Sequence, residues 1–283
     1  MREVVNAERI VLALVLVVFA LILTLLGFIL WFSLPLFFSG DLAVFSLLWR
    51  PEAGHYGIVP MVVGSAMIGI GALVLALPVA LGIVGFCLHE RHQSAAVWIR
   101  SLIRLMAGIP TVVYGLAALF LLVPLLRETF RSGSGYCLLA AMVMVVLLIL
   151  PVMVMMLDSH CRPLAARLKL TGTALGFSET QQVFYLILPN AQRGFFSAAL
   201  LGFSRAIGDT LLPLMLAGNA PQLTGSLLDS VRALTAHIGL VIATEYGSDA
   251  YNSLFAAGLL LLSLSISTTL LLRKIERRQS DKR

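Results

Sequence analysis

Residues 158–194 read DSHCRPLAARLKLTGTALGFSETQQVFYLILPNAQRG, a polar stretch in a chain that is otherwise almost entirely apolar. Its charged and amide side chains include Arg162, Arg167, Lys169, Glu179, Gln181, Gln182 and Arg193. A connection of this length between two hydrophobic segments usually has a function of its own. The segments on either side decide the fold class.

Composition indicates an integral membrane protein. Of the 283 residues, 59% are hydrophobic and 12% are charged, with a mean hydropathy of +0.98. Soluble domains contain about 45–50% apolar and about 25% charged residues. The net charge of +6 does not indicate nucleic-acid binding, because the charges lie in short loops and at the two ends, as membrane orientation requires.

Six segments approach or exceed the roughly 20 apolar residues that a membrane helix needs. They are 10–36, 58–88, 104–126, 135–157, 194–217 and 252–272. The first apolar run exceeds the about 7–15 residues of a signal-peptide core, so we expect an uncleaved anchor. The sequence predicts an all-α membrane protein in which residues 1–283 form one transmembrane domain with a loop at about 158–190.

The distribution of Lys and Arg predicts the orientation. With both ends in the cytoplasm, fifteen of the 20 basic residues lie on that side and four (Arg50, Arg127, Arg131 and Arg232) on the other, while Arg205 lies inside a segment. Cytoplasmic loops are enriched in Lys and Arg. The polar stretch therefore faces the cytoplasm.

Within the polar stretch, Asp158 and Ser159 are expected to cap a membrane helix, and Pro163 suits the first turn of a new one. Leu164, Leu168 and Leu175 share one face of that new helix. Gly176 permits a bend or a helix C-cap, and Pro189 is expected to end the apolar run Phe184–Leu188. Two interpretations remain open: an amphipathic helix on the bilayer surface, or a helix presented to a partner protein.

Arg205 and Asp209 are the charges placed within a predicted span. At about 1.5 Å per residue they lie roughly 18 and 24 Å along it, and a charge near the bilayer centre costs at least ~2.5 kcal/mol. Four residues apart, they lie on one helix face and are expected to pair. Either the pair only neutralises itself, or Arg205 lines an anion path and Asp209 holds it.

The remaining residue types carry less information. Gly202, Gly208 and Thr210 allow close helix packing, and Pro213 is expected to kink the outer half of its span. Gly108, Pro110 and Gly115 are better explained by helix packing than by an anion site. We expect solvated histidines, without ligand-like spacing, at His89, His92 and His237, and neither a disulfide nor a metal cluster from Cys87, Cys137 and Cys161.

Four segments resemble the permeases of ABC importers. The spacing from Gly176 to Leu186-Ile187-Leu188-Pro189 is similar to their cytoplasmic loop signature. SRAIGDTLLPLMLAGNAPQ, residues 204–222, resembles the fifth-span motif of phosphate importer permeases, and LPVALGIVGFCLHE (77–90) and GIPTVVYGL (108–116) are similar to further segments of the PstA and PstC subunits. Apparent similarity across residues 226–256 favours the PstA type, with PstC as the related subunit.

The resemblance implies a type I ABC importer permease fold with six spans and a cytoplasmic coupling helix that docks on an ATPase subunit. The implied coupling positions are Leu170, Thr171, Gly172, Gly176, Leu188 and Pro189, with Leu170-Thr171-Gly172 in place of the usual Glu-Ala-Ala. For the substrate pathway it implies Arg205, Asp209 and Thr210, with Asp209 in place of the commoner Glu. The implied cargo is inorganic phosphate, and the implied location is the bacterial inner membrane.

No phosphate-binding Walker loop is present, since none of the three lysines, Lys169, Lys274 and Lys282, follows a glycine. We therefore expect no cofactor on this chain, with ATP and Mg on a partner ATPase. A second related permease subunit and an extracytoplasmic phosphate-binding protein are expected as well. Alternatives are a permease for phosphonate, sulfate or molybdate, an ion-driven secondary transporter, and a structural or signalling membrane subunit.

Overall fold

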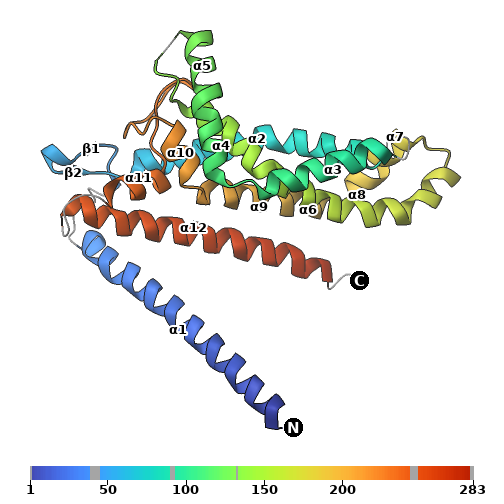
Figure 1. Cartoon of the computed structure of the whole chain (residues 1–283), viewed down its shortest axis with the longest axis horizontal. Coiled ribbons are helices and arrows are strands. Elements are labelled where there is room, and N and C mark those ends of the chain that lie inside the picture. The colour runs from blue at the N-terminus through green and yellow to red at the C-terminus, as the bar shows by residue number, and fades with distance from the viewer. Residues whose placement is uncertain (1, 39–44, 90–92, 132, 243–247, 281–283) are drawn as a thin grey trace.

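A computed structural model describes residues 2–38, 45–89, 93–131, 133–242 and 248–280. It is helical almost throughout (Figure 1). Five helical segments are long and apolar enough to cross a membrane: Glu8–Leu34, Val59–Cys87, Thr111–Phe130, Leu138–Ala174 and Ala250–Leu271. The predicted all-α membrane fold is confirmed.

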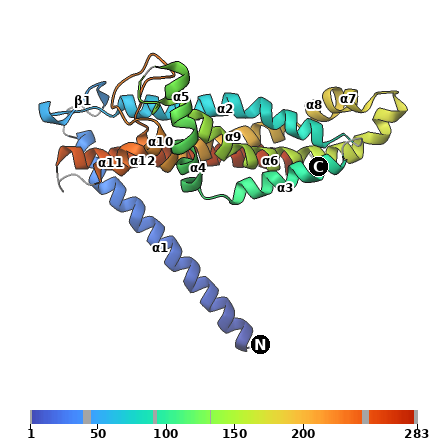
Figure 2. The same ribbon diagram turned by 45° about the horizontal axis from the view of Figure 1, so that its top comes forward.

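Three helices run side by side along the long axis of the molecule: α2 (Val59–Cys87), α6 (Leu138–Ala174) and α9 (Gln192–Gly208) (Figures 1 and 2). Small side chains permit their close packing. Ala72, Ala76 and Ala80, each four residues after the last, are fully buried on α2. At Gly202 of α9, a Cβ atom would lie 2.7 Å from the Sδ of Met153. The predicted packing role of Gly202 is confirmed.

The third span is divided. α3 (Gln93–Gly108) ends before Pro110, and the chain resumes as α4 (Thr111–Ala117), the π-helix η4 (Ala118–Leu122) and α5 (Val123–Phe130). Figures 1 and 2 show α4 and α5 turned steeply away from α3. The span predicted at 104–126 is therefore interrupted, because Pro110 is extended (ψ 142°) and disfavours a helical conformation at Ile109.

The span predicted at 194–217 is also divided, into α9 and α10 (Leu211–Leu216), with Asp209 extended between them (ψ 130°). In a continuous helix the Asp209 carbonyl would accept the N–H of residue 213, but Pro213 has none. The Thr235 hydroxyl donates to that carbonyl instead, at 2.8 Å. Pro213 thus accompanies a break before α10 rather than a kink, and no sixth continuous span is formed in the described residues.

The fourth span is longer than predicted. α6 starts at Leu138 and continues through Pro163 to Ala174, so no new helix begins at Pro163. Asp158 and Ser159 do not cap a helix end, because Asp158 binds two arginines and the Ser159 hydroxyl donates to the Met156 carbonyl of its own helix. After α6 come α7 (Glu179–Gln181), the π-helix η5 (Gln182–Ile187) and α8 (Leu188–Asn190).

The far end of the bundle has its own core. There β1 (Trp49–Arg50) pairs antiparallel with β2 (His55–Tyr56) around the 3-10 turn η2 (Pro51–Ala53) and lies near α11 (Leu234–Val241). His237 is fully buried, its ring 4.4 Å from that of Trp49 and its Nε2 3.2 Å from the Ser253 hydroxyl. The prediction of a solvated His237 is wrong, because the chain folds back over this short helix.

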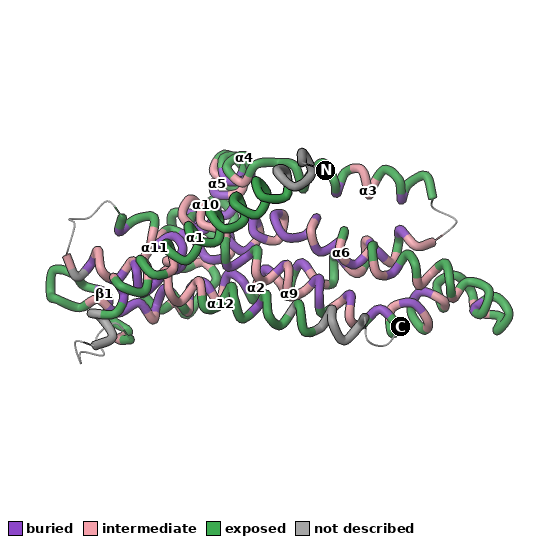
Figure 3. Tube along the Cα trace, turned by 90° about the horizontal axis from the view of Figure 1, so that it is seen from below, coloured by how far each residue is buried: buried purple, intermediate pink, exposed green. Residues whose placement is uncertain are grey.

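The two terminal helices, α1 (Arg2–Phe38) and α12 (Asp249–Ser280), meet through an aromatic cluster of Phe28, Phe32 and Phe255. α1 then diverges from the bundle (Figures 1 and 2). No residue is buried in the most apolar 18-residue window of the Glu8–Leu34 segment, and Figure 3 shows most of the helix exposed, with Ser33 buried near its end. Such an all-apolar, exposed helix is suited to lipid or to another membrane subunit.

Candidate functional site

The predicted coupling segment begins with the end of α6. Gly176 has a left-handed backbone (φ +74°), the Gly176 N–H donates to the Thr173 carbonyl at 3.0 Å, and the Phe177 N–H donates to the Gly172 carbonyl at 3.0 Å. This pair of hydrogen bonds is the Schellman motif, which ends a helix at a glycine. The bend predicted at Gly176 is confirmed.

A second helical segment follows the bend at once. Ser178 caps it: the Gln181 N–H donates to the Ser178 hydroxyl at 3.3 Å, and the Ser178 N–H donates to the Gln181 side-chain oxygen at 2.9 Å. This reciprocal capping box fixes where the helix starts. The segment ends at Asn190, one residue beyond Pro189, and leads into α9. Residues 138–208 therefore form a helical hairpin that returns to the membrane bundle.

The two arms of the hairpin touch at Gly172. A Cβ atom at this position would lie 2.6 Å from the side-chain Cδ of Gln182, and Gln182 donates to the Phe177 carbonyl at 3.1 Å. Gly172 is buried, whereas Leu170 is 80% exposed. Of the other predicted coupling positions, Thr171, Gly176 and Pro189 are exposed and Leu188 is half-buried. The hairpin is therefore internally braced and presents Leu170 at its surface.

An ion-pair cluster at the base of the hairpin joins three helices. The Arg100 guanidinium of α3 donates to both carboxylate oxygens of Asp158 on α6, each at 3.1 Å, and to the Cys87 carbonyl at the end of α2, at 2.9 Å. Arg162 lies 3.1 Å from the same carboxylate. Sequence reasoning missed this cluster, because Arg100 and Asp158 are far apart in the chain and no local pattern pairs them.

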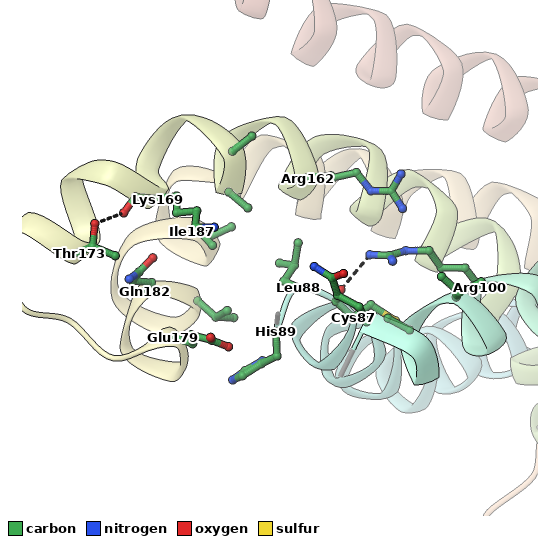
Figure 4. Close-up of a pocket in the computed structure, with 16 residues that line it drawn as sticks. Cys87, Leu88, His89, Arg100, Arg162, Lys169, Thr173, Glu179, Gln182 and Ile187 are labelled. Carbon is green, nitrogen blue, oxygen red and sulfur yellow. Dashed lines mark hydrogen bonds between the residues drawn. The ribbon is translucent and has the colours of Figure 1, made fainter. Parts of the chain in front are cut away.

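A cavity of about 530 Å³ separates the hairpin from the end of α2. Figure 4 shows Leu88 and His89 facing the segment that carries Glu179 and Gln182 across it. His89 bridges the gap: its Nδ1 lies 3.0 Å from the Gly85 carbonyl and its Nε2 lies 3.0 Å from the Thr180 hydroxyl. The partly buried His89 thus ties α2 to the hairpin, while His92 lies outside the described residues.

The predicted ion pair of Arg205 and Asp209 is not formed. Helix α9 ends at Gly208, and one carboxylate oxygen of Asp209 accepts the Leu212 N–H at 2.9 Å, which caps α10. Within the described part of the chain, Arg205 has no hydrogen bond or ion pair, and its side chain is exposed. Thr210 follows Asp209 in the non-helical segment between α9 and α10 and is half-buried. The local pairing that would have neutralised Arg205 is absent from the described structure.

The breaks in the third and fifth spans lie together. α4 packs on α10, where a Cβ at Gly115 would lie 2.5 Å from the Met215 Sδ. Pro110 has no N–H to donate to the Met106 carbonyl as the next turn of an α-helix would. That carbonyl accepts instead from the hydroxyl of Tyr114 on α4, at 2.9 Å, and from the Ile109 N–H, at 3.2 Å. Sequence reasoning read this glycine-proline cluster as packing, but it also interrupts the helix.

The cysteines Cys87, Cys137 and Cys161 are free thiols, all buried. In the residues that the structure describes, no group of three or more His, Cys, Asp or Glu side chains is placed to hold a metal ion. Neither observation points to redox or metal chemistry at the helical hairpin or around Arg205.

Comparison with known proteins identifies the family of this chain. A family model for binding-protein-dependent transport system inner membrane components matches residues 82–281. The chain belongs to this family of ABC transporter permeases. It is 33% identical over 241 residues to a probable ABC transporter permease protein, YqgH, of Bacillus subtilis (strain 168), covering 83% of this chain and 77% of that protein.

A second relative is the phosphate transport system permease protein PstC of Xylella fastidiosa (strain Temecula1), 26% identical over 260 residues, with 84% of this chain and 79% of the relative covered. This relative is a PstC protein, whereas the sequence favoured the PstA type, with PstC as the related subunit. A structure titled as an inward-facing conformation of the MetNI methionine ABC transporter aligns with a TM-score of 0.57 at 16% identity, over 81% of this chain and 99% of that one. The fold is that of a type I ABC importer permease.

Proposed function

We propose that this permease carries inorganic phosphate and forms half of a translocation pathway, in which Arg205 contacts the passing anion. The observation that carries the proposal is the exposed guanidinium of Arg205, which makes no hydrogen bond or ion pair with the described residues and lies near a non-helical segment of the fifth predicted span. Non-helical backbone at membrane depth is tolerated only where it is buried in protein or lines a water-filled cavity. The phosphate-transport names of relatives such as PstC support the choice of substrate.

The chemistry of the proposed pathway follows from the side chains. A charge on a membrane-spanning helix faces protein partners or a water-filled path, and Arg205 has no partner in the described residues. A guanidinium matches phosphate oxygens with two parallel hydrogen bonds. Asp209, in the segment after α9, would limit how tightly the anion is held, because a carboxylate near the site repels it, and Thr210 would line the pathway beside Asp209.

The helical hairpin is proposed to dock an ATPase subunit through Leu170, Thr171, Gly172, Gly176, Leu188 and Pro189. It is braced internally at Gly172, and its second arm continues through one turn into α9, the helix that carries Arg205. Movement of the hairpin would therefore reach the proposed pathway through continuous backbone. ATP and Mg would be held by the ATPase subunit, since this chain has no Walker loop.

The proposed assembly contains cytoplasmic ATPase subunits, a second related permease and an extracytoplasmic phosphate-binding protein, in the bacterial inner membrane with both ends of this chain cytoplasmic. Residues 1 and 283, which would mark those ends, lie outside the described residues. The exposed apolar residues Phe120 and Leu121, 77% and 73% exposed, lie on the segment turned away from the bundle. They are suited to contact with the second permease or with lipid.

The test is ATP hydrolysis by the complex purified with its partner subunits in lipid nanodiscs, with the binding protein loaded by phosphate, phosphonate, sulfate or molybdate in turn. Phosphate is expected to give the largest stimulation. The Arg205→Leu complex should lose it, whereas Arg127→Gln, which removes an exposed charge on α5, should keep it. Stimulation by sulfate or molybdate but not by phosphate would assign a different oxyanion.

A further inference from the structure

A groove of about 330 Å³ lies between α3 and α6 at the ion-pair cluster, and Arg100 and Arg162 line both this groove and the hairpin cavity. The two helices run alongside each other here (Figures 1 and 2). The groove has a basic part, formed by Arg100, Arg104 and Arg162, and an apolar part that includes Ile103, Val154 and Met155. It is therefore amphipathic along its length.

The basic part has more positive charge than the protein neutralises. Three guanidinium groups and a single carboxylate, that of Asp158, line the groove. Asp158 already accepts two hydrogen bonds from Arg100 and lies 3.1 Å from Arg162. Arg104 uses only its Nε, which donates to the Arg100 carbonyl at 3.3 Å. The two terminal nitrogens of Arg104 have no acceptor in the described residues, and the groove carries a net charge of about +2 by this comparison.

The groove also lies at a boundary between apolar and polar surface. Trp98, Leu102 and Leu105 are 79%, 57% and 70% exposed and form a stripe on the adjacent face of α3. Beyond the groove, α6 continues into the polar hairpin. Exposed tryptophan is typical of the membrane–water interface, so the arginines are placed where lipid headgroups meet the protein.

We propose that this groove binds the phosphate group of an anionic phospholipid from the leaflet that borders the hairpin end of the bundle. Arg104 and Arg162 hold the phosphate, since guanidinium groups form paired hydrogen bonds to phosphate oxygens. One acyl chain lies along Met155, which is 39% exposed. Basic pockets between membrane helices favour anionic headgroups in this way. The proposed lipid site does not depend on which substrate the permease carries. The predicted orientation of the chain only decides whether the lipid comes from the inner or the outer leaflet.

The test is native mass spectrometry of the full chain, purified in detergent and titrated with phosphatidylglycerol or with phosphatidylcholine. Phosphatidylglycerol is expected to bind more tightly than phosphatidylcholine. Arg104→Gln is expected to lower the affinity for phosphatidylglycerol by about fivefold, the effect typical of one interfacial arginine. Arg104→Gln with Arg162→Gln should abolish the preference. The control is Arg167→Gln, which removes an exposed arginine of the same helix α6 outside the groove.

Equal affinity for the two lipids, or an unchanged preference in Arg104→Gln, would overturn the proposal. The single change leaves the Asp158 ion pairs intact, so it remains informative if the double variant does not fold. Inorganic phosphate added at millimolar concentration should not displace the lipid. Displacement would assign the groove to a free anion instead, and loss of lipid on adding the ATPase subunit would assign it to a protein contact.

Discussion

Arg100 and Arg205 are both arginines on helices of the bundle, but their surroundings differ completely. Arg100 makes three hydrogen bonds, two to Asp158 and one to the end of α2, and is 20% exposed. Arg205 is exposed and has no partner among the described residues, because the helix ends before Asp209 can pair with it. The comparison separates a charge that holds helices together from one that is left available for a ligand.

The largest loss of stability is expected when the ion-pair cluster of Arg100 and Asp158 is disrupted. Asp158→Asn removes the carboxylate that two arginines share, and leaves Arg100 largely buried without a counter-charge. Breaking a buried ion pair costs about 3 kcal/mol or more. The thermal unfolding midpoint of the purified protein should fall clearly, while Glu128→Gln, at an exposed acid of α5, should leave it unchanged. Equal midpoints for both variants would show that the cluster is not structural.

A smaller effect is expected at the hairpin bend. Gly176→Val places a β-branched residue at φ +74°, where a left-handed backbone costs about 1–2 kcal/mol. Space is not the constraint, since no atom lies within 4 Å of a Cβ there. We expect weaker co-purification with the ATPase and lower transport-coupled hydrolysis, with normal membrane insertion. Thr173→Val, an exposed position in the helix just before the bend, is the control, and equal coupling in the two variants would contradict a docking role for the bend.

Features set by neighbouring residues could be predicted from the sequence, whereas contacts between distant residues could not. The membrane class, the bend at Gly176 and the family follow from local composition and spacing, which one sequence contains. The Arg100–Asp158 contact and the burial of His237 depend on residues distant in the chain, so no local pattern predicts them. The broken spans carried a signal, Pro110 and Pro213, but hydropathy over a 20-residue window averages across a break that hydroxyl donors from Tyr114 and Thr235 stabilise.

The smallest effect on stability is expected from acidification at His237, which lies outside the candidate spans. Burial, together with the smaller effect of the nearby positive charge of Arg232, lowers the pKa of His237 from 6.5 to about 3. The Ser253 hydroxyl donates to the Ala250 carbonyl, so His237 donates from Nε2, and protonating the buried Nδ1 would add a donor with no acceptor in the described residues.

Because the folded state binds this proton less readily than the unfolded state, the contribution of His237 is complete above pH 6.5 and is lost as the pH falls from 6.5 towards 3. The loss should be roughly 1 kcal/mol per pH unit. Unfolding midpoints at pH 7.5 and pH 5.5 measure it, and His237→Phe, which cannot titrate, should show a smaller difference. A variant with the same pH dependence as the wild type would exclude His237 as the source.

The central claim is that Arg205 is unpaired because it serves the anion. The most direct measurement is phosphate uptake by cells that produce Arg205→Lys, Arg205→Leu, Asp209→Leu and the double-leucine variant at matched membrane abundance. The Arg205 variants should insert and assemble, because no ion pair in the described structure depends on Arg205. Variants at Asp209 also lose the acceptor of the Leu212 N–H, so matched membrane abundance is checked for them before uptake is compared. Arg205→Lys should lose uptake although it keeps the charge, since a lysine lacks the planar fork, and the double-leucine variant should not recover it. Full uptake by the double-leucine variant would contradict the account.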